Sequence, residues 1–342
     1  MRTILVTGGA GFIGSNFVHY WRNKYPDDRV FVLDCLTYAG SVENLPPRDE
    51  NDDKLVFWYG NVRNGALVDT LVAETDVVVH FAAESHVTRS IYDNFHFFET
   101  DVLGTQTIAN AVTKFRERVE RFIHISTSEV YGTAESEFMS EDHPLNPLSP
   151  YAAAKAGADR LVYSSVKTYG IPGVIVRPFN NYGPRQHLEK LVPRFITSVL
   201  LGEPLTVHGG GEAMRDFIHA SDTCRALDLL IHADIEKVRG EVYNLGSGRS
   251  LSINDIADIV TRVMGCPDHP REMVGDRPGQ VFRHTAGAEK VKKAVGWTPE
   301  LSFEAGVRQT IEWYRENRRY WEPQLWMRHI PIITSSGKRQ LH

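Results

Sequence analysis

The sequence predicts an α/β fold in which a doubly wound parallel sheet is followed by a smaller C-terminal α/β lobe. Short β-branched and aromatic runs alternate with amphipathic stretches through the first half of the chain. Strands that alternate with helices need crossover connections, which make the strands parallel and put helices on both faces of the sheet. We expect strands at residues 3–6, 30–33, 55–58, 77–81, 122–126 and 174–176, and helices at 14–23, 105–116 and 151–169.

The second half of the chain has a different composition and shorter predicted elements. After Pro178, turns rich in glycine and proline separate shorter elements, among them a helix at 253–264 that Ser252 is expected to cap. A helix near 222–232 is expected to return to the sheet and cover it. We therefore divide the chain into a sheet domain, a smaller lobe and a tail, which cover residues 1–178, 179–320 and 321–342.

Composition and charge exclude several classes of protein. The 342 residues include 38 Lys and Arg against 43 Asp and Glu, so the net charge is −5 and no basic excess indicates a nucleic-acid partner. The longest apolar runs are strand-sized and no secretory leader precedes the first strand, so we expect a cytoplasmic protein without a membrane span. Three widely spaced cysteines and 14 histidines without ligand spacing predict neither disulfides nor a metal site.

Three glycines form a candidate phosphate-binding turn. Gly8, Gly11 and Gly14 follow the first expected strand and open the first expected helix. Glycine lets the backbone approach a pyrophosphate, and the helix N-terminus offers N–H groups and a partial positive charge. Asp34 ends the second strand, where a carboxylate accepts the ribose hydroxyls and repels a 2′-phosphate. The pattern predicts a Rossmann-type domain over 1–178 that binds NAD rather than NADP.

A second set of residues carries acid–base chemistry. Tyr151 and Lys155 are four residues apart on an expected helix and therefore share one face. An ammonium and a positive nicotinamide both favour the tyrosine phenolate, which brings proton abstraction within reach. Ser126 and Thr127 end an expected strand, and Glu129 follows shortly after. A carboxylate beside a transient ketone can remove the acidified α-proton, which predicts elimination or epimerisation.

These motifs resemble a known family. The Gly-x-x-Gly-x-x-Gly spacing and the Tyr-x-x-x-Lys pair are similar to the extended, sugar-nucleotide branch of the short-chain dehydrogenase/reductase superfamily. The chain resembles the nucleoside-diphosphate-hexose 4,6-dehydratases up to about residue 320, in the stretches 36–40, 80–90, 149–151, 180–184, 189–193, 215–217 and 276–279. The resemblance implies a nucleotide-sugar-binding lobe over 179–320 and a homodimer formed through helices near 94–115 and 151–168.

The resemblance also implies a reaction in three stages. Tyr151 removes the C4 hydroxyl proton while a hydride passes from C4 to NAD, Glu129 then removes the C5 proton as water leaves C6, and the hydride returns to C6. Lys155 is implied to bind the nicotinamide ribose and to lower the pKa of Tyr151, and Thr127 to hydrogen-bond the reacting oxygen. The implied product is a nucleoside-diphosphate-4-keto-6-deoxyhexose, and NAD is regenerated in each turnover.

Family position also assigns the site residues. The implied catalytic residues are Thr127, Ser128, Glu129, Tyr151 and Lys155. The implied cofactor contacts are Gly8, Gly11, Phe12, Ile13, Gly14, Asp34, Asn61, Val62, Ala82, Ala83, Tyr151 and Lys155. The implied nucleotide-sugar contacts, whose cations suit a diphosphate, are Ser85, His86, Asn180, Asn181, Lys190, Arg215, Asn244 and Arg277.

One departure from the family pattern concerns the leaving group. The dTDP-glucose dehydratases carry Thr-Asp-Glu, in which the Asp is the acid for the departing hydroxyl, whereas this chain has Ser128 between Thr127 and Glu129. A serine cannot supply that acid at neutral pH, so Glu129 would have to serve both C5 and the leaving hydroxyl. Asn61 and Gln280 also depart from the dTDP-glucose pattern.

The Thr-Ser-Glu sequence leaves several reactions open. It resembles GDP-mannose 4,6-dehydratases, UDP- or GDP-N-acetylglucosamine dehydratases, and UDP-glucuronate decarboxylases, in which the 4-ketone itself drives loss of CO₂. A 4,6-dehydratase is favoured because residues 83–87 and 149–155 resemble dehydratases at places where decarboxylases differ. The alternatives are a UDP-glucuronate decarboxylase, a nucleotide-sugar 4-epimerase, and a catalytically inactive NAD-sensing protein.

Overall fold

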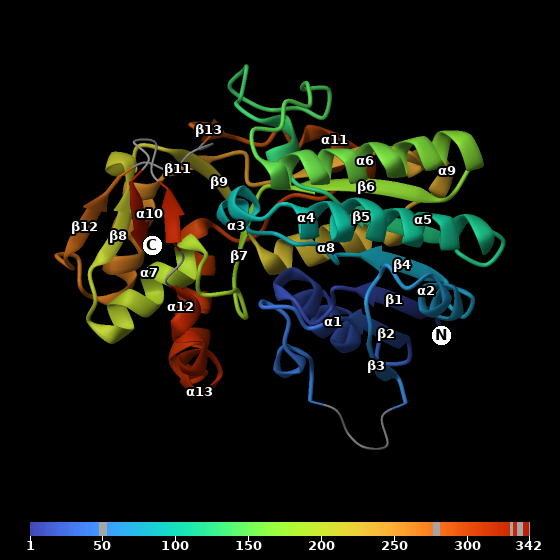
Figure 1. The fold of residues 1–342 in the computed structure, drawn as a ribbon, viewed down its shortest axis with the longest axis horizontal. Helices are drawn as coiled ribbons and strands as arrows, with labels where there is room; N and C mark the ends of the chain where they lie inside the picture. Colours follow the sequence, from blue (N-terminus) through green and yellow to red (C-terminus); the bar gives the residue numbers. More distant parts are fainter. Residues whose placement is uncertain (48–52, 276–280, 329–330, 334–337, 342) are drawn as a thin grey trace.

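A seven-stranded parallel sheet is the largest sheet in the described part of the chain (Figure 1). The computed structural model describes residues 1–47, 53–275, 281–328, 331–333 and 338–341. The strand order is β10 (Val242–Leu245), β6 (Gly173–Pro178), β5 (Arg121–Ile125), β4 (Val77–His80), β1 (Thr3–Thr7), β2 (Arg29–Asp34) and β3 (Leu55–Tyr59). The six strands expected in the first half are present, so the predicted Rossmann-type sheet is confirmed.

Helices cover both faces of this sheet because successive residues of a buried strand point to opposite sides. On β1, Ile4 and Val6 belong to one buried apolar cluster, and Leu5 belongs to another. The first cluster includes side chains of α1 (Phe12–Lys24) and α8 (Ala220–His232), and the second those of α2 (Gly65–Val72), α5 (Thr105–Lys114) and α6 (Pro150–Tyr169). The strand's alternation therefore sets the three-layer arrangement.

Local sequence sets where the helices begin. Ser252 caps α10 (Ile253–Met264) as predicted: its hydroxyl oxygen accepts from the Asp255 N–H at 3.0 Å, and the Asp255 carboxylate accepts from the Ser252 N–H at 2.9 Å. The helix expected at 105–116 is α5, but the segment before it winds as a π-helical turn, η2 (Phe98–Gly104). That turn changes which side chains face inward before α5.

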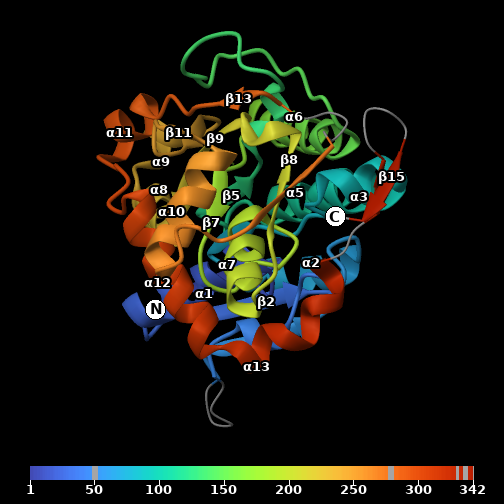
Figure 2. The ribbon, with the colours of Figure 1, turned by 90° about the vertical axis from the view of Figure 1, so that its left-hand side faces the viewer.

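The second lobe is a smaller α/β unit, seen in Figure 2 with α7 and α10 toward the viewer. In it, β9 (Met214–His219) pairs with β7 (Asn180–Tyr182), β11 (Ser250–Ser252) and β13 (Arg283–His284), and β8 (Leu205–His208) pairs with β12 (Arg271–Val274). An apolar cluster joins α7 (Leu191–Leu201), α10 and α12 (Phe303–Glu316). Shorter elements are α3 (Val87–Tyr92), α4 (Phe95–Phe97), α9 (Ile235–Val238), α11 (Glu289–Val295), α13 (Arg318–Trp321), β14 (Pro331–Ile333), β15 (Arg339–Leu341), and the turns η1 (Val42–Asn44), η3 (Ser128–Tyr131), η4 (Gly209–Gly211) and η5 (Glu322–Arg328).

The chain crosses between the layers more often than a single boundary at residue 178 allows. Helix α8 returns to the sheet, as expected, and β10 also returns and pairs with the edge of β6. An added strand satisfies the backbone groups of an edge that would otherwise be exposed. In the tail, Trp321 is fully buried and its Nε1–H donates to the Tyr314 carbonyl at 2.7 Å.

The described part of the chain offers neither a membrane span nor a metal site. None of its helices is long and apolar enough to cross a bilayer. The same residues contain no group of three or more His, Cys, Asp or Glu side chains placed to hold a metal ion.

Candidate active site

A large cavity lies between the lobes at the carboxyl ends of the parallel strands, where open α/β sheets bind ligands. Its volume is about 460 Å³. Most of the predicted site residues line it, namely Gly8, Gly11, Phe12, Ile13, Gly14, Asp34, Asn61, Val62, Ala82, Ala83, Ser85, His86, Thr127, Glu129, Tyr151, Lys155, Asn180, Asn181, Lys190 and Arg215. Residues that are far apart in the sequence therefore share one cavity.

The glycine turn leaves room only for backbone. Gly8 has a φ of +66°, and a Cβ placed on it would lie 2.6 Å from the Ala82 nitrogen. A Cβ on Gly14 would collide with the Gly8 carbonyl oxygen. Gly11 is the N-cap of α1 and has no side chain to satisfy the first-turn N–H groups, which therefore remain donors for a ligand. This arrangement fits the pyrophosphate of a dinucleotide.

Asp34 is the last residue of β2 and lines the same cavity. Its carboxylate accepts hydrogen bonds from the N–H groups of Ala10, at 2.9 Å, and Leu36, at 2.8 Å. These bonds orient the carboxylate, while burial raises its pKa. Asn61 and Val62 follow β3 and line the same cavity. The oriented acceptor fits a dinucleotide ribose that carries no 2′-phosphate.

The predicted acid–base residues converge on the cavity from the end of β5 and from α6. Ser149 caps α6 by accepting a hydrogen bond from the Ala152 N–H at 3.2 Å, which places Tyr151 in the first turn and Lys155 one turn later. The Lys155 Nζ donates to the Ile125 carbonyl, at the end of β5, at 2.7 Å. The pair therefore shares one helix face, as predicted, and the lysine is held against the sheet.

Glu129 enters the cavity from the turn η3. The Thr127 hydroxyl oxygen accepts from the Glu129 N–H at 3.2 Å, which caps this turn directly after β5. Both residues line the cavity together with Tyr151. The predicted hydroxyl, carboxylate and phenol groups are therefore in one place.

Burial dominates the electrostatics of this group. Burial and then the charge of Asp101 raise the pKa of Tyr151 above its ordinary value, and the hydrogen bond with Thr127 opposes this rise. Burial lowers the pKa of Lys155, and Asp101 opposes that change. Among the protein's own groups, burial and Asp101 therefore dominate the pKa of Tyr151, and the lowering expected from Lys155 together with a positive nicotinamide stays a prediction. The protein's own groups keep the phenol protonated.

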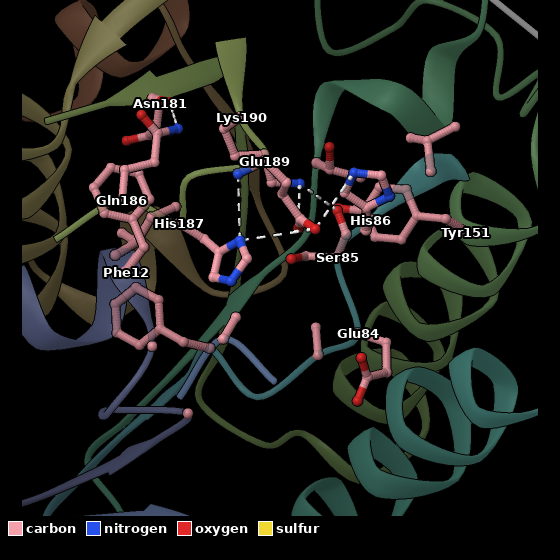
Figure 3. A pocket seen from close by; sticks show the side chains of 18 of the residues that line it. Phe12, Glu84, Ser85, His86, Tyr151, Asn181, Gln186, His187, Glu189 and Lys190 are labelled. Carbon is pink, nitrogen blue, oxygen red and sulfur yellow. Dashed lines mark hydrogen bonds and ion pairs between the residues drawn. The ribbon is translucent and has the colours of Figure 1, made fainter. Parts of the chain in front are cut away.

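A buried carboxylate joins the two lobes beside these residues (Figure 3). The Glu189 side chain is 1% exposed. Tyr38 donates its hydroxyl to Oε1 at 3.0 Å, and Oε2 lies 3.4 Å from Arg89 Nε and 3.6 Å from His86 Nε2. The cluster ties segments that follow β2 and β4 to the second lobe. Glu189 lies in one of the stretches that resemble the family, but the sequence alone indicates no role for it.

The comparisons with known proteins agree with this geometry. A family model described as GDP-mannose 4,6 dehydratase matches residues 5–310. The chain belongs to this family. The low-salt glycan biosynthesis protein Agl12 of Haloferax volcanii is 46% identical over 312 residues, which cover 91% of this chain and 98% of that protein. The dTDP-glucose 4,6-dehydratase of Streptomyces niveus is 42% identical over 325 residues, which cover 94% and 95%.

Solved structures place the chain within the same family. DesIV, a dTDP-glucose 4,6-dehydratase from Streptomyces venezuelae with NAD and TYD bound, superposes with a TM-score of 0.88 at 42% identity, covering 94% of this chain and 99% of that one. The UDP-glucose 4-epimerase of Thermotoga maritima reaches 0.84 at 29% identity, covering 92% and 99%. The fold is shared with epimerases, but the identity is higher with the dehydratases. The chain is thus an extended short-chain dehydrogenase/reductase of the 4,6-dehydratase type, as its motifs predicted.

Two residues assigned by family position lie outside the cavity lining. Asn244 is fully buried on β10, where its Oδ1 accepts from the Tyr131 hydroxyl at 2.7 Å and its Nδ2 donates to the Met139 carbonyl at 2.9 Å. Its amide is thus engaged by the protein core and is not offered to a nucleotide sugar. Ser128 is 2% exposed and does not line the cavity, because its neighbours in η3 take that position. Outside the described residues lie Arg277 and Gln280.

Sequence reasoning missed Asp101. This residue lies on η2, is fully buried, and acts electrostatically on both Tyr151 and Lys155. No motif marked it, because the sequence predicts a regular helix near 94–115 and the π-helical turn alters which side chains point inward. An acid beside the Tyr-Lys pair is therefore a finding of the tertiary structure.

Proposed function

We propose that the protein is an NAD-retaining nucleoside-diphosphate-hexose 4,6-dehydratase that forms a 4-keto-6-deoxyhexose. The observation that carries this proposal is the position of Glu129 in one cavity with Tyr151 and the glycine turn. Oxidation of a hydroxyl needs no carboxylate beyond the tyrosine, whereas removal of the C5 proton beside a 4-ketone needs a base. Relatives named as dehydratases, matched over more than nine-tenths of the chain, support the same reaction.

The two lobes divide the binding of cofactor and substrate. The glycine turn and the N-terminus of α1 hold the NAD pyrophosphate, and Asp34 accepts hydrogen bonds from a ribose. When bound, NAD takes the hydride from C4 of the sugar and returns it to C6. Lys190 and Arg215 line the cavity from the second lobe and supply positive charge for the diphosphate.

The acid–base residues then act on the sugar. Tyr151 takes the proton of the C4 hydroxyl, and Thr127, which is hydrogen-bonded to Tyr151, orients the reacting oxygen. Lys155, whose Nζ donates to the Ile125 carbonyl, binds the nicotinamide ribose. Glu129 removes the C5 proton and also protonates the departing C6 hydroxyl, because Ser128 does not line the cavity. This assigns one carboxyl group to both halves of the elimination.

Product masses test the proposal. Purified protein is incubated separately with dTDP-glucose, GDP-mannose, UDP-N-acetylglucosamine and UDP-glucuronate, without added cofactor. We expect one hexose substrate to lose the mass of one water. Loss of the mass of CO₂ from UDP-glucuronate would identify a decarboxylase instead, and an unchanged mass with altered chromatographic retention would identify an epimerase.

We also propose a homodimer formed through the segment 94–115 and α6. Large apolar side chains are exposed on these elements: Phe95 is 64%, Phe98 42%, Leu103 49% and Tyr163 37% exposed. Apolar patches of this kind mark association surfaces. Sedimentation should give the mass of two subunits, and Leu103→Glu should shift the population from the dimer toward the monomer. A wild-type protein that sediments as a monomer would contradict this proposal.

A further inference from the structure

His284, on β13, is fully buried behind the cavity. Its Nε2 lies 2.7 Å from the carbonyl oxygen of Gly132. A carbonyl oxygen only accepts hydrogen bonds, so Nε2 carries a proton and donates it. The protonation state of the residue is therefore decided at the other ring nitrogen, Nδ1.

The Nδ1 atom faces Glu129. It lies 3.9 Å from the Glu129 Oε1, and it has no hydrogen-bond partner among the residues that the structure describes. The Glu129 side chain is 23% exposed toward the cavity, so it has space to turn and bring its carboxyl group within hydrogen-bond distance. A buried ring nitrogen with no partner is costly unless a partner reaches it.

The surroundings keep Nδ1 as an acceptor. Burial is the largest influence and lowers the pKa of His284, and the charges of Arg215 and His143 lower it further. Glu129 and the hydrogen bond to Gly132 act in the opposite direction. The ring of Phe179 packs against the imidazole with a centroid distance of 6.1 Å. A neutral imidazole with a lone pair toward a carboxyl group is suited to accept a hydrogen bond from that group once it is protonated.

We propose that His284 is a positioning residue that accepts a hydrogen bond from protonated Glu129 and so holds the C5 proton until it leaves with the C6 hydroxyl. In this step the C5–H bond breaks, its proton goes to the Glu129 carboxylate, and its electron pair forms the C5=C6 bond. The C6–O bond breaks, and the oxygen takes the Glu129 proton and departs as water. His284 is unchanged overall. The inference rests on the proposed dehydratase function.

This role accounts for the missing acid beside Thr127. A protonated carboxyl group without a fixed partner can rotate, so its proton is not held toward the C6 oxygen that must receive it. With Nδ1 as a fixed acceptor, the protonated carboxyl keeps one orientation during elimination. Ser128 then needs no chemical role, in agreement with its buried position outside the cavity.

The test separates C4 oxidation from elimination. His284→Gln places its amide near the Nε2 position, where its nitrogen can donate to the Gly132 carbonyl, and leaves no acceptor atom at the Nδ1 position that faces Glu129. We expect product formation to fall about 100-fold, at the low end for acid–base contributions, while reduced nicotinamide accumulates in its absorbance band because C4 oxidation continues. His19→Gln is the matched control, since its ring also bonds a backbone carbonyl, at 3.0 Å, and does not line the cavity.

Two further measurements exclude a merely structural effect. Wild-type elimination should slow as the pH falls through the His284 pKa, because a proton on Nδ1 removes the acceptor, and His284→Gln should lose this dependence. In a Glu129→Gln background the same change should have no further effect. Three results would overturn the inference. They are an equal loss of C4 oxidation and elimination in His284→Gln, a pH profile of His284→Gln that matches wild type, and a further loss of activity when His284→Gln is added to Glu129→Gln. If His284→Gln does not fold, His284→Phe, whose ring has no acceptor atom, replaces it. A wild-type protein that removes water from no substrate would refute the proposed function itself.

Discussion

Replacement of Asp101 by Asn tests whether a buried acid beside the Tyr151–Lys155 pair is held protonated. The Asp101 carboxyl is fully buried; Oδ1 accepts from the Glu84 N–H at 2.8 Å, and Oδ2 has no hydrogen-bond partner among the described residues. Burial raises the pKa of Asp101 from 3.8 to about 8, although Lys155 opposes the rise. The side chain is therefore mostly neutral at neutral pH.

The sign and size of the effect on stability follow from this pKa. Between pH values near 4 and 8 the folded state binds the Asp101 proton while the unfolded chain has lost it, so the folded state loses stability as the pH rises. Each pKa unit is worth about 1.4 kcal/mol, so this loss grows by about 4 kcal/mol between about pH 5 and about pH 9. Asp101→Asn cannot ionise and escapes the loss. Relative to wild type, the variant should gain about 4 kcal/mol over that interval.

Urea unfolding at the two pH values, followed by tryptophan fluorescence, measures the difference. An unpartnered buried amide costs about 1 to 3 kcal/mol, so the variant is expected to be no more stable than wild type at the lower pH and more stable at the higher pH. Asp268→Asn, at an exposed position, is the matched control and should change stability by less than about 0.5 kcal/mol at either pH. A stability difference for Asp101→Asn that does not grow with pH would refute the reasoning.

Four other substitutions test the remaining parts of the site. Gly8→Ala should weaken NAD binding at least about tenfold in calorimetry, because the added Cβ requires a strained φ and meets Ala82; unchanged affinity would refute the close approach. Asp34→Asn should reduce the ratio of NAD affinity to NADP affinity in the same assay, whereas an unchanged affinity ratio would mean that another group distinguishes the two riboses. Glu129→Gln should reduce product formation about 10²- to 10⁴-fold while reduced nicotinamide accumulates, and full activity would remove Glu129 from the elimination step. Glu189→Gln should lower the free energy of unfolding by about 1 to 3 kcal/mol, because it weakens the hydrogen bond from the Tyr38 hydroxyl and leaves the partly exposed Arg89 guanidinium without its anion. Urea unfolding that matches wild type would show that the cluster does not hold the lobes together.

Much of the fold could be predicted because its signals are local. The first six sheet strands are short apolar runs, and the α10 cap is set by Ser252 and Asp255, which are three residues apart. The glycine turn and the Tyr151–Lys155 spacing likewise depend on neighbours within one or two turns. Such patterns predict the same local structure wherever the segment lies in the fold, because backbone geometry alone determines which side chains share a face.

The sequence by itself determined the class of sheet, and it indicated a candidate cofactor turn and candidate acid–base residues. Only the tertiary structure decided that β10 joins the sheet, that Asn244 faces the core, that Asp101 lies beside Lys155, and that Glu189 links the lobes. His284 illustrates the reason, since its partner Gly132 is 152 positions away in the chain. Contacts of that range depend on how strands and helices pack against one another, and a single step along a strand reverses the face to which a side chain points.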